Sequence, residues 1–342
     1  MNCRDRVLAA LDFEEPDILP YTLPMEDEVG RRMDARLGGP TWRKRVEDHI
    51  ALVQLPTLSV REGAASYTDA FGSTWCTDKR PFHLENLALP EPDLSDYSWP
   101  EIDALWNEDL VHQQIRRAQT HGQFIVASTG FGIFERSWTL RGFENALTDM
   151  LLHRAFYAEL LDGVLNIHLR IVERLLTLPI DGILLSDDWG AQRGMIMGPN
   201  LWRTFIKPRV QQFNSAVHAG GKWTFHHCCG NVFEIIPEMI ESGLDVLESL
   251  QPEAMDVYEI KRRYGRDLRL WGGLGTQRLL PFGTPQEIRS EVRRLCQELG
   301  RGGGYILAPS KPLMSEVPTE NALAVVEAFT ATTRSPTQAS AP

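Results

Sequence analysis

Short apolar runs alternate with longer amphipathic segments along most of this chain. The best of these runs are hydrophobic at nearly every position rather than at every second one, which is typical of strands buried on both faces of a parallel sheet. This alternation therefore predicts an α/β fold with its helices packed around a parallel sheet. We predict strands at residues 18–23, 123–128, 182–186, 222–228, 245–249, 268–272 and 305–308, with a weaker candidate at 58–61.

The segments between these strands have the length and spacing of amphipathic helices. One of them begins with a clear signal, because Thr284 suits the N-cap position and Pro285 suits the first helical position. We predict helices at residues 143–176 (as one helix or two), 200–219, 232–242, 256–264, 285–299 and 320–331.

An open doubly wound sheet and a closed (β/α)₈ TIM barrel both fit this order of elements. The chain has no Gly-x-Gly-x-x-Gly after its first strand, which removes the main reason to choose a dinucleotide-binding fold. Polar residues instead crowd the carboxyl ends of several strands, as they do at the mouth of a barrel enzyme. We therefore expect one barrel domain at 1–331, in which residues 1–120 include an N-terminal extension that caps the mouth. The Ser-, Thr- and Pro-rich tail at 332–342 is expected to be disordered.

Composition excludes several classes of function. The net charge of −11 over 342 residues offers no basic surface for nucleic acid and disfavours an anionic membrane. Apolar runs fall short of the roughly 20 residues that span a bilayer, and no signal peptide is recognisable at the start. Five cysteines, an odd number, do not resemble a disulfide framework. We expect a cytoplasmic protein.

The run from His226 to Cys229 carries the most chemistry, because two imidazoles and two thiols lie side by side at the end of a predicted strand. Alternation points His227 and Cys229 to one side and the other pair to the opposite side. Nitrogen and sulfur are donors that suit Zn²⁺. An isolated His-x-Cys is more often ordinary packing, since zinc needs three or four donors. A bulge at the strand end would exchange the two pairs.

Several longer stretches resemble the uroporphyrinogen decarboxylase superfamily. They lie at residues 69–75, 140–142, 187–192, 220–231, 241–247, 251–252, 272–280, 283–288, 302–309 and 317–321. The resemblance covers most of the chain and keeps the order of the motifs. It implies a (β/α)₈ barrel with the site at the carboxyl ends of the strands. The superfamily includes porphyrinogen decarboxylases, which use no metal, and zinc-dependent methyltransferases that work with a corrinoid.

The chain is closer to the methyltransferase branch. The Arg-rich motif of the decarboxylases is replaced by an acidic stretch at 25–32, which suits a polyanionic tetrapyrrole poorly. His227, Cys229 and Gly230 match the His-x-Cys-Gly of the methyltransferases, which implies a zinc site. The Cys that this branch carries on its last strand is replaced here by Ser310 and Lys311. Glu248, on the neighbouring strand, is the candidate third ligand, although it could instead pair with Lys311.

Other candidate site residues have equally plausible structural roles. Asp188 is favoured over Asp187 as the carboxylate that faces the mouth, for acid–base work or for capping a turn. Asp69 falls in the family's site region but also suits a turn, and Lys311 is a candidate partner for a carboxylate. Candidate substrate contacts are Phe131, Trp138, Arg141 and Gln192.

Three function classes follow. The first is a zinc-dependent methyltransferase for a methylated or methoxylated small molecule. The barrel and its cap use the length of the chain, so the cobalamin is expected on a partner protein. The second is a decarboxylase or lyase acting on a small aromatic or pyrrolic carboxylate without a cofactor. The third is a binding protein that kept the barrel and lost its chemistry. Bound metal separates the first class from the others.

Overall fold

A curved parallel sheet forms the centre of the computed structural model, which describes residues 1–55, 65–78 and 82–332. Its strands follow the order β1-β5-β6-β9-β10-β11-β12, so each strand pairs with the next one along the chain. This is the strand order of a (β/α)₈ TIM barrel. The strands are β1 (Ile50–Val53), β5 (Phe124–Phe131), β6 (Gly182–Ser186), β9 (Trp223–His227), β10 (Val246–Leu250), β11 (Arg269–Leu274) and β12 (Tyr305–Pro309).

An irregular stretch at residues 20–25 fills the gap between β12 and β1. Tyr21 and Met25 make isolated parallel bridges to Leu307 and Leu313 on one side, and the Tyr21 carbonyl accepts the backbone N–H of His49 on the other. The predicted strand at 18–23 therefore lies in the barrel wall but forms no regular ladder. The two prolines explain this, because Pro20 and Pro24 have no N–H to donate to a neighbouring strand.

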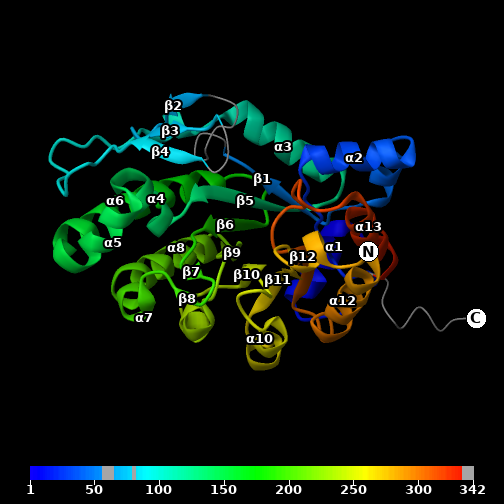
Figure 1. Ribbon diagram of the computed structural model, residues 1–342. Coiled ribbons are helices and arrows are strands. Elements are labelled where there is room, and N and C mark those ends of the chain that lie inside the picture. The colour runs from blue at the N-terminus through cyan, green and yellow to red at the C-terminus, as the bar shows by residue number, and fades with distance from the viewer. Residues whose placement is uncertain (56–64, 79–81, 333–342) are drawn as a thin grey trace, which may run out of the picture.

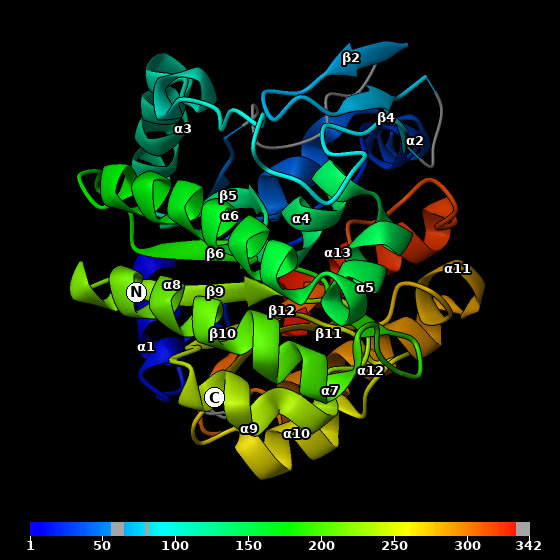
Figure 2. The same cartoon turned by 90° about the vertical axis from the view of Figure 1, so that its left-hand side faces the viewer.

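Helices surround the outside of the sheet, and Figure 2 shows α6 and α8 in front of β5, β6 and β9. The α-helices are α1 (Cys3–Leu11), α2 (Asp27–Leu37), α3 (Glu108–Thr120), α4 (Ile133–Arg141), α5 (Phe143–Leu152), α6 (Arg154–Leu175), α7 (Gly198–Leu201), α8 (Lys207–Ala219), α9 (Ile236–Glu241), α10 (Val257–Tyr264), α11 (Leu279–Phe282), α12 (Pro285–Glu298) and α13 (Thr319–Thr332). Shorter helical turns are η1 (Pro40–Arg45), η3 (Ile102–Leu105), η4 (Trp202–Ile206) and η5 (Phe233–Ile235). Thr284 caps α12 as predicted, in a reciprocal capping box with Glu287.

The barrel interior is a separate hydrophobic core that α1 closes from below. Every strand of the sheet contributes at least one inward side chain to it, including Phe124, Leu184 and Phe225, and Val7 and Leu11 of α1 pack against them. This core fills the end of the barrel where the strands begin. Inside the barrel, this core leaves space for a ligand toward the carboxyl ends of the strands.

The N-terminal region divides between the wall, the base and the rim of the barrel. The small antiparallel sheet of β2 (Ser66–Thr68), β3 (Thr74–Cys76) and β4 (His83–Asn86) lies beside β5 and α4 (Figure 1). Trp75 on β3 stacks on Phe131 at the end of β5, with ring centroids 5.9 Å apart. The sequence analysis expected a cap over the mouth within residues 1–120, and Phe82, just before β4, lines the mouth cavity. Strand β1 was missed by the sequence analysis, and both the weak strand candidate at 58–61 and nearly all of the predicted tail lie outside the described residues.

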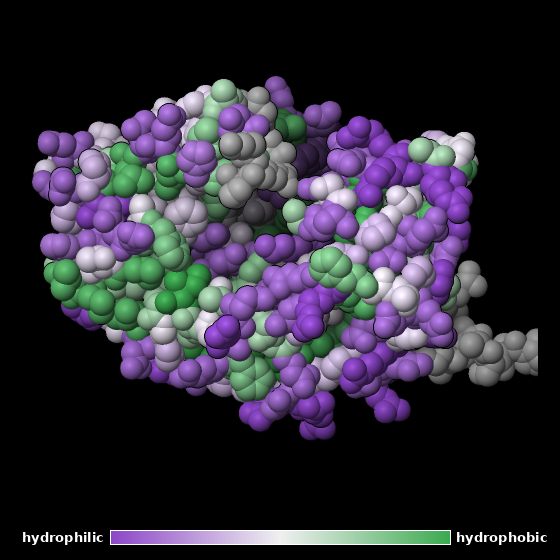
Figure 3. Space-filling view, in the orientation of Figure 1, coloured by the Kyte–Doolittle hydropathy of each residue, from purple (hydrophilic) through white to green (hydrophobic). Residues whose placement is uncertain are grey.

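The outer surface carries one apolar patch over α5. Phe143, Leu151 and Leu152 are exposed there, and Figure 3 shows hydrophobic surface on the side of the molecule where α5 lies. These side chains do not line the cavity at the mouth. Within the described part of the chain, no helix combines the length and the apolar character that crossing a membrane requires.

Candidate metal centre at the mouth of the barrel

Three neighbouring strands bring polar side chains to the same level of the mouth. His227 is the last residue of β9, and in the sheet it lies opposite Ser186 of β6 on one side and Glu248 of β10 on the other. Adjacent residues in a parallel register point to the same face, and all three side chains line the cavity described below. The end of β9 therefore carries an imidazole flanked by a hydroxyl and a carboxylate.

The two nitrogens of the His227 ring face different partners. Nδ1 lies 2.5 Å from Oε2 of Glu248. Nε2 lies 3.3 Å from Sγ of Cys229 and 3.7 Å from Oδ1 of Asp188. The same Asp188 oxygen accepts the backbone N–H of Cys229 at 2.6 Å. Asp188, His227 and Cys229 thus form a cluster whose ligand atoms all lie within 4.8 Å of one another.

The spacing of this cluster fits a zinc ion. Donors around a tetrahedral zinc lie roughly 3.4 to 3.6 Å apart, from metal–ligand bonds of about 2.0 to 2.3 Å. The two distances from His227 Nε2, 3.3 Å to Cys229 and 3.7 Å to Asp188, bracket that value. Glu248 has the position of a carboxylate that hydrogen-bonds the other nitrogen of a metal-binding histidine. One nitrogen, one sulfur and one oxygen donor are therefore in place.

Negative charge is concentrated around His227. Burial lowers the pKa of His227, but the charge of Glu248 and the contact with Cys229 outweigh it, so the pKa rises well above the usual value. For Glu135, a carboxylate, burial has the opposite effect and raises the pKa, and the charges of Asp188 and Asp187 raise it further. Such crowding of carboxylates is unfavourable unless protons or a cation compensate it.

The carboxylate next to Asp188 has a structural role. Asp187 is buried and accepts the backbone N–H groups of Phe134 and Glu135 at the start of α4, together with the indole N–H of Trp189. Burial raises the pKa of Asp187 to about 7. The side chain anchors α4 to the end of β6, whereas Asp188, which the sequence analysis favoured for the mouth, lies beside His227 and Cys229.

The other half of the His-Cys run points out of the barrel. His226 is buried, and its Nε2 lies 2.8 Å from Oδ1 of Asn214 on α8. The sulfur of Cys228 accepts the backbone N–H of Trp189 at 3.2 Å. Strand alternation therefore separates the pairs as predicted, and no bulge reverses them.

Two glycines let the loops after β6 and β9 touch. Gly230 has φ +78°, and a Cβ there would lie 2.4 Å from the carbonyl carbon of Gly190. A Cβ on Gly190 would lie 2.5 Å from the carbonyl oxygen of Cys229. Because only glycine fits both positions, Asp188 and Cys229 are held side by side by backbone contact.

A cavity of about 640 Å³ lies in the mouth, a size that suits a small organic molecule. Apolar side chains make up most of its wall, among them Phe131, Leu184 and Trp271. Among the described residues that line it, Lys311 is the only Lys or Arg. His227 and Glu248 belong to both the cavity and the candidate metal centre, so a ligand in the cavity would lie against His227.

Comparison with known proteins places the chain in a family. Residues 111–332 match the family described as uroporphyrinogen decarboxylase (URO-D), which is more than half of the chain. The chain belongs to this family. No curated protein sequence matches the chain.

Solved structures support the fold of this URO-D family member. A methyltransferase from Methanosarcina mazei superposes with a TM-score of 0.70 at 22% identity, over 96% of this chain and 98% of that one. A GH113 beta-1,4-mannanase gives a TM-score of 0.45 at 8% identity, over 92% of this chain and 100% of the other. The first likeness supports the barrel fold, and the second is too weak to carry an argument.

The predicted substrate residues of this URO-D protein do not all reach the cavity. Phe131 lines it. Arg141 is buried in an ion pair with Asp149 and donates to two backbone carbonyls, so its contacts are structural. Gln192 hydrogen-bonds Gln277 and Gln251. Trp138 packs against Phe131 and Phe143, behind the cavity wall.

Of the predicted catalytic residues Lys311 and Asp69, only Lys311 lines the cavity. Lys311 is exposed at the rim and lines the cavity. Asp69 accepts the backbone N–H groups of Phe71 and Ser73 and lies 3.3 Å from Arg136. It does not line the cavity, so its geometry favours the turn role that the sequence analysis had weighed against catalysis.

Sequence reasoning missed Glu135 and the role of Ser186. Glu135 lies in the first turn of α4, where its charge interacts with those of Asp188 and His227. Its signal was available, since it follows shortly after the Gly130-Phe131-Gly132 stretch that comes after a predicted strand. Ser186 was read only as the last residue of a strand, and its place beside His227 depends on the sheet register.

Proposed function

We propose that this protein is a zinc-dependent methyltransferase that acts on a methylated or methoxylated small molecule. The observation that carries the proposal is the convergence of Asp188, His227 and Cys229 beside a mostly apolar cavity. The methyltransferase neighbour at 22% identity shares the fold and is consistent with this reading.

In this proposal Asp188, rather than Glu248, completes the ligand set with His227 and Cys229. Glu248 contacts Nδ1 of His227, on the opposite side of the ring from Cys229. It would therefore hold the imidazole in the tautomer whose Nε2 lone pair faces the metal. Ser310 and Lys311 replace the cysteine that the methyltransferase branch carries on its last strand. The carboxylate of Asp188, just after β6, would take the place of that missing ligand.

Bound zinc would supply a Lewis acid for the atom that carries the methyl group. The remaining work belongs to this chain's side chains. Breaking a methyl–oxygen bond leaves the electron pair on oxygen, which then needs a proton. Glu135 does not line the cavity, although burial raises its pKa, so the oxygen would take its proton from solvent as the demethylated product leaves. The apolar wall, which includes Phe131 and Trp271, would exclude water from the reacting group.

The cavity favours a flat substrate with one anionic group. Phe131 and Trp271 offer aromatic surface, and Lys311 at the rim offers a cation. A methoxylated aromatic carboxylate or phenolate has these features. A tetrapyrrole with several carboxylates does not, since it would need several cations. The methyl group would pass to a corrinoid carried by a partner protein, because the described residues are used by the barrel and its cap.

The test is demethylation of candidate methoxyaromatics by the full chain in the presence of a reduced corrinoid protein, with and without zinc. We expect zinc-dependent methyl transfer that Cys229→Ser abolishes. Cys228→Ser is the matched control, because the neighbouring thiol is buried on the outer side of β9. Release of CO₂ from a carboxylated analogue without methyl transfer would favour the decarboxylase class instead.

A further inference from the structure

A second group of metal-ligand side chains lies at the opposite end of the barrel. Cys3 begins α1, and Glu47 and His49 come just before β1. Their ligand atoms also lie within 4.8 Å of one another. These residues surround the amino end of β1, whereas His227 is at the carboxyl end of β9. The two groups are therefore separate.

His49, a member of this group, has a buried ring nitrogen without a hydrogen-bond partner among the described residues. His49 is 1% exposed, and its Nδ1 lies 3.3 Å from both the backbone nitrogen and the carbonyl oxygen of Tyr21. Nε2 has no hydrogen-bond partner among the described residues. A buried ring nitrogen without a partner is costly. In the tautomer that donates from Nδ1 to the Tyr21 carbonyl, Nε2 keeps its lone pair, and His49 then has the arrangement of a metal ligand.

The two other donors come from different environments. Cys3 is 2% exposed and lies against the barrel at the start of α1. Glu47 is 65% exposed, so water can reach the group from its side. Together the three side chains offer nitrogen, sulfur and oxygen, a mixed set that suits Zn²⁺ better than Mg²⁺ or Ca²⁺.

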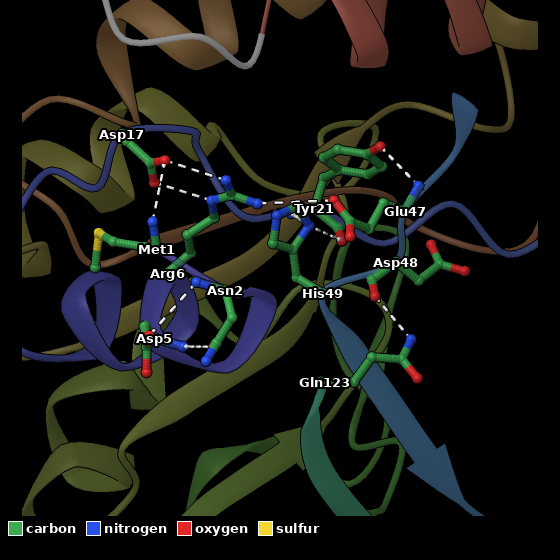
Figure 4. A network of polar contacts seen from close by, with 10 residues as sticks. All are labelled: Met1, Asn2, Asp5, Arg6, Asp17, Tyr21, Glu47, Asp48, His49 and Gln123. Carbon is green, nitrogen blue, oxygen red and sulfur yellow. Dashed lines mark hydrogen bonds and ion pairs between the residues drawn. The ribbon is translucent and has the colours of Figure 1, made fainter. Parts of the chain in front are cut away.

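Arg6 is a cation close to this group, and it is ion-paired with Asp17. Its Nε and NH2 atoms bind the two oxygens of Asp17 at 2.9 and 3.1 Å (Figure 4). The remaining nitrogen, NH1, lies 3.7 Å from Glu47, a longer contact. The Glu47 carboxylate meanwhile lies within 4.8 Å of the ligand atoms of Cys3 and His49.

We propose that Cys3, Glu47 and His49 bind a second zinc ion, with water in the remaining position. This ion would tie α1 to the strand that begins at Ile50, and so fasten the closed base of the barrel. The site does not depend on the proposed methyl transfer, since none of its residues lines the mouth cavity.

Zinc stoichiometry of the full, untagged chain tests this proposal. The protein is stripped with a chelator and titrated with zinc against a chromophoric competitor. We expect two zinc ions for the wild type, one for Cys3→Ala, one for Cys229→Ala and none for the double variant. Cys296→Ala is the control, because Cys296 on α12 belongs to neither group, and it should keep two. Equal stoichiometry in Cys3→Ala and the wild type would overturn the base site. One ion in the wild type and none in Cys3→Ala would instead overturn the mouth site.

A second variant guards against a folding defect in Cys3→Ala. Glu47→Gln changes an exposed side chain, and in the Cys229→Ala background it should weaken zinc binding at least tenfold without unfolding the protein. In the Cys229→Ala protein that keeps Glu47, zinc should raise the Tm and slow hydrogen exchange of residues 3–11. Unchanged exchange in this helix on zinc addition would contradict the proposed link between α1 and β1.

Discussion

Oε2 of Glu248 lies 2.5 Å from Nδ1 of His227, on the opposite side of the ring from the sulfur of Cys229. This relationship gives Glu248 and Asp188 different roles, although both are carboxylates beside the same imidazole. In the proposed function Glu248 would set the tautomer and orientation of the ring, and Asp188 would share the side that faces the metal.

We expect Glu248→Gln to weaken zinc binding at the mouth by roughly 10- to 100-fold while one ion still binds there, because loss of an outer carboxylate partner typically costs that much. The affinity is measured by competition in the Cys3→Ala background, so that only the mouth site is counted. Glu241→Gln, an exposed change on α9, serves as the control. Complete loss of the ion in Glu248→Gln would make Glu248 a direct ligand.

Gly230→Ala should destabilise the protein and loosen the site. Its φ of +78° is unfavourable for alanine, and the new methyl would press on the backbone of Gly190. We expect a loss of about 1–3 kcal/mol in the free energy of unfolding and weaker zinc binding. Gly194→Ala is the control, since a Cβ there meets nothing within 4 Å. Urea denaturation measures both, and equal stability of the two variants would contradict the contact between the loops.

The free energy of unfolding should decrease as the pH falls below about 6.5, because buried histidines resist protonation in the folded protein. Burial lowers the pKa of His168 to about 4, below the value of about 6.5 in an unfolded chain. Its contribution is therefore fully present above pH 6.5 and is lost as the pH falls toward 4. The slope for one such group is about 1.4 kcal/mol per pH unit.

The test of this contribution is the pH dependence of the unfolding free energy in His168→Gln, which cannot take up the proton. We expect a shallower decline between pH 6.5 and 4 than in the wild type. The decline will not vanish, because burial also lowers the pKa of His226, to about 3. His121→Gln, at an exposed position, should keep the wild-type slope. An unchanged slope in His168→Gln would contradict the assignment.

Lys311→Met should raise the KM for a methoxyaromatic carboxylate by about tenfold, which corresponds to about 1.4 kcal/mol. Its effect on an uncharged analogue should be small, because the lost contact is electrostatic. Steady-state kinetics on the two substrates measure this difference. The same change in KM for both would show that Lys311 does not bind the anionic group.

The central strands were predictable because their signals are local. Strand β6 is a continuous apolar run, and strand alternation alone separates His227 from His226. By contrast, β1 has four residues, two of which are not buried, so its run is short and mixed. Helix α4 buries Arg136 and Arg141 as well as apolar residues, so it shows no apolar stripe.

The details of the site depend on contacts between strands. Glu248 was predicted to lie next to His227, but the nitrogen it contacts follows from the register of β9 and β10. The turn role of Asp69 was one predicted alternative, but the ion pairs of Asp69 with Arg136 and of Arg141 with Asp149 could not be predicted, because they form only through tertiary packing of α4. Sequence pattern places a residue at the mouth, and tertiary contacts decide its function.

The most direct test of the central claim is an anomalous difference map at the zinc edge from crystals of the zinc-loaded protein. The account predicts a peak within about 2.0 to 2.4 Å of Oδ1 of Asp188, Nε2 of His227 and Sγ of Cys229, with Glu248 still on Nδ1. A mouth without a peak, in crystals grown at saturating zinc, would contradict the proposed metal centre.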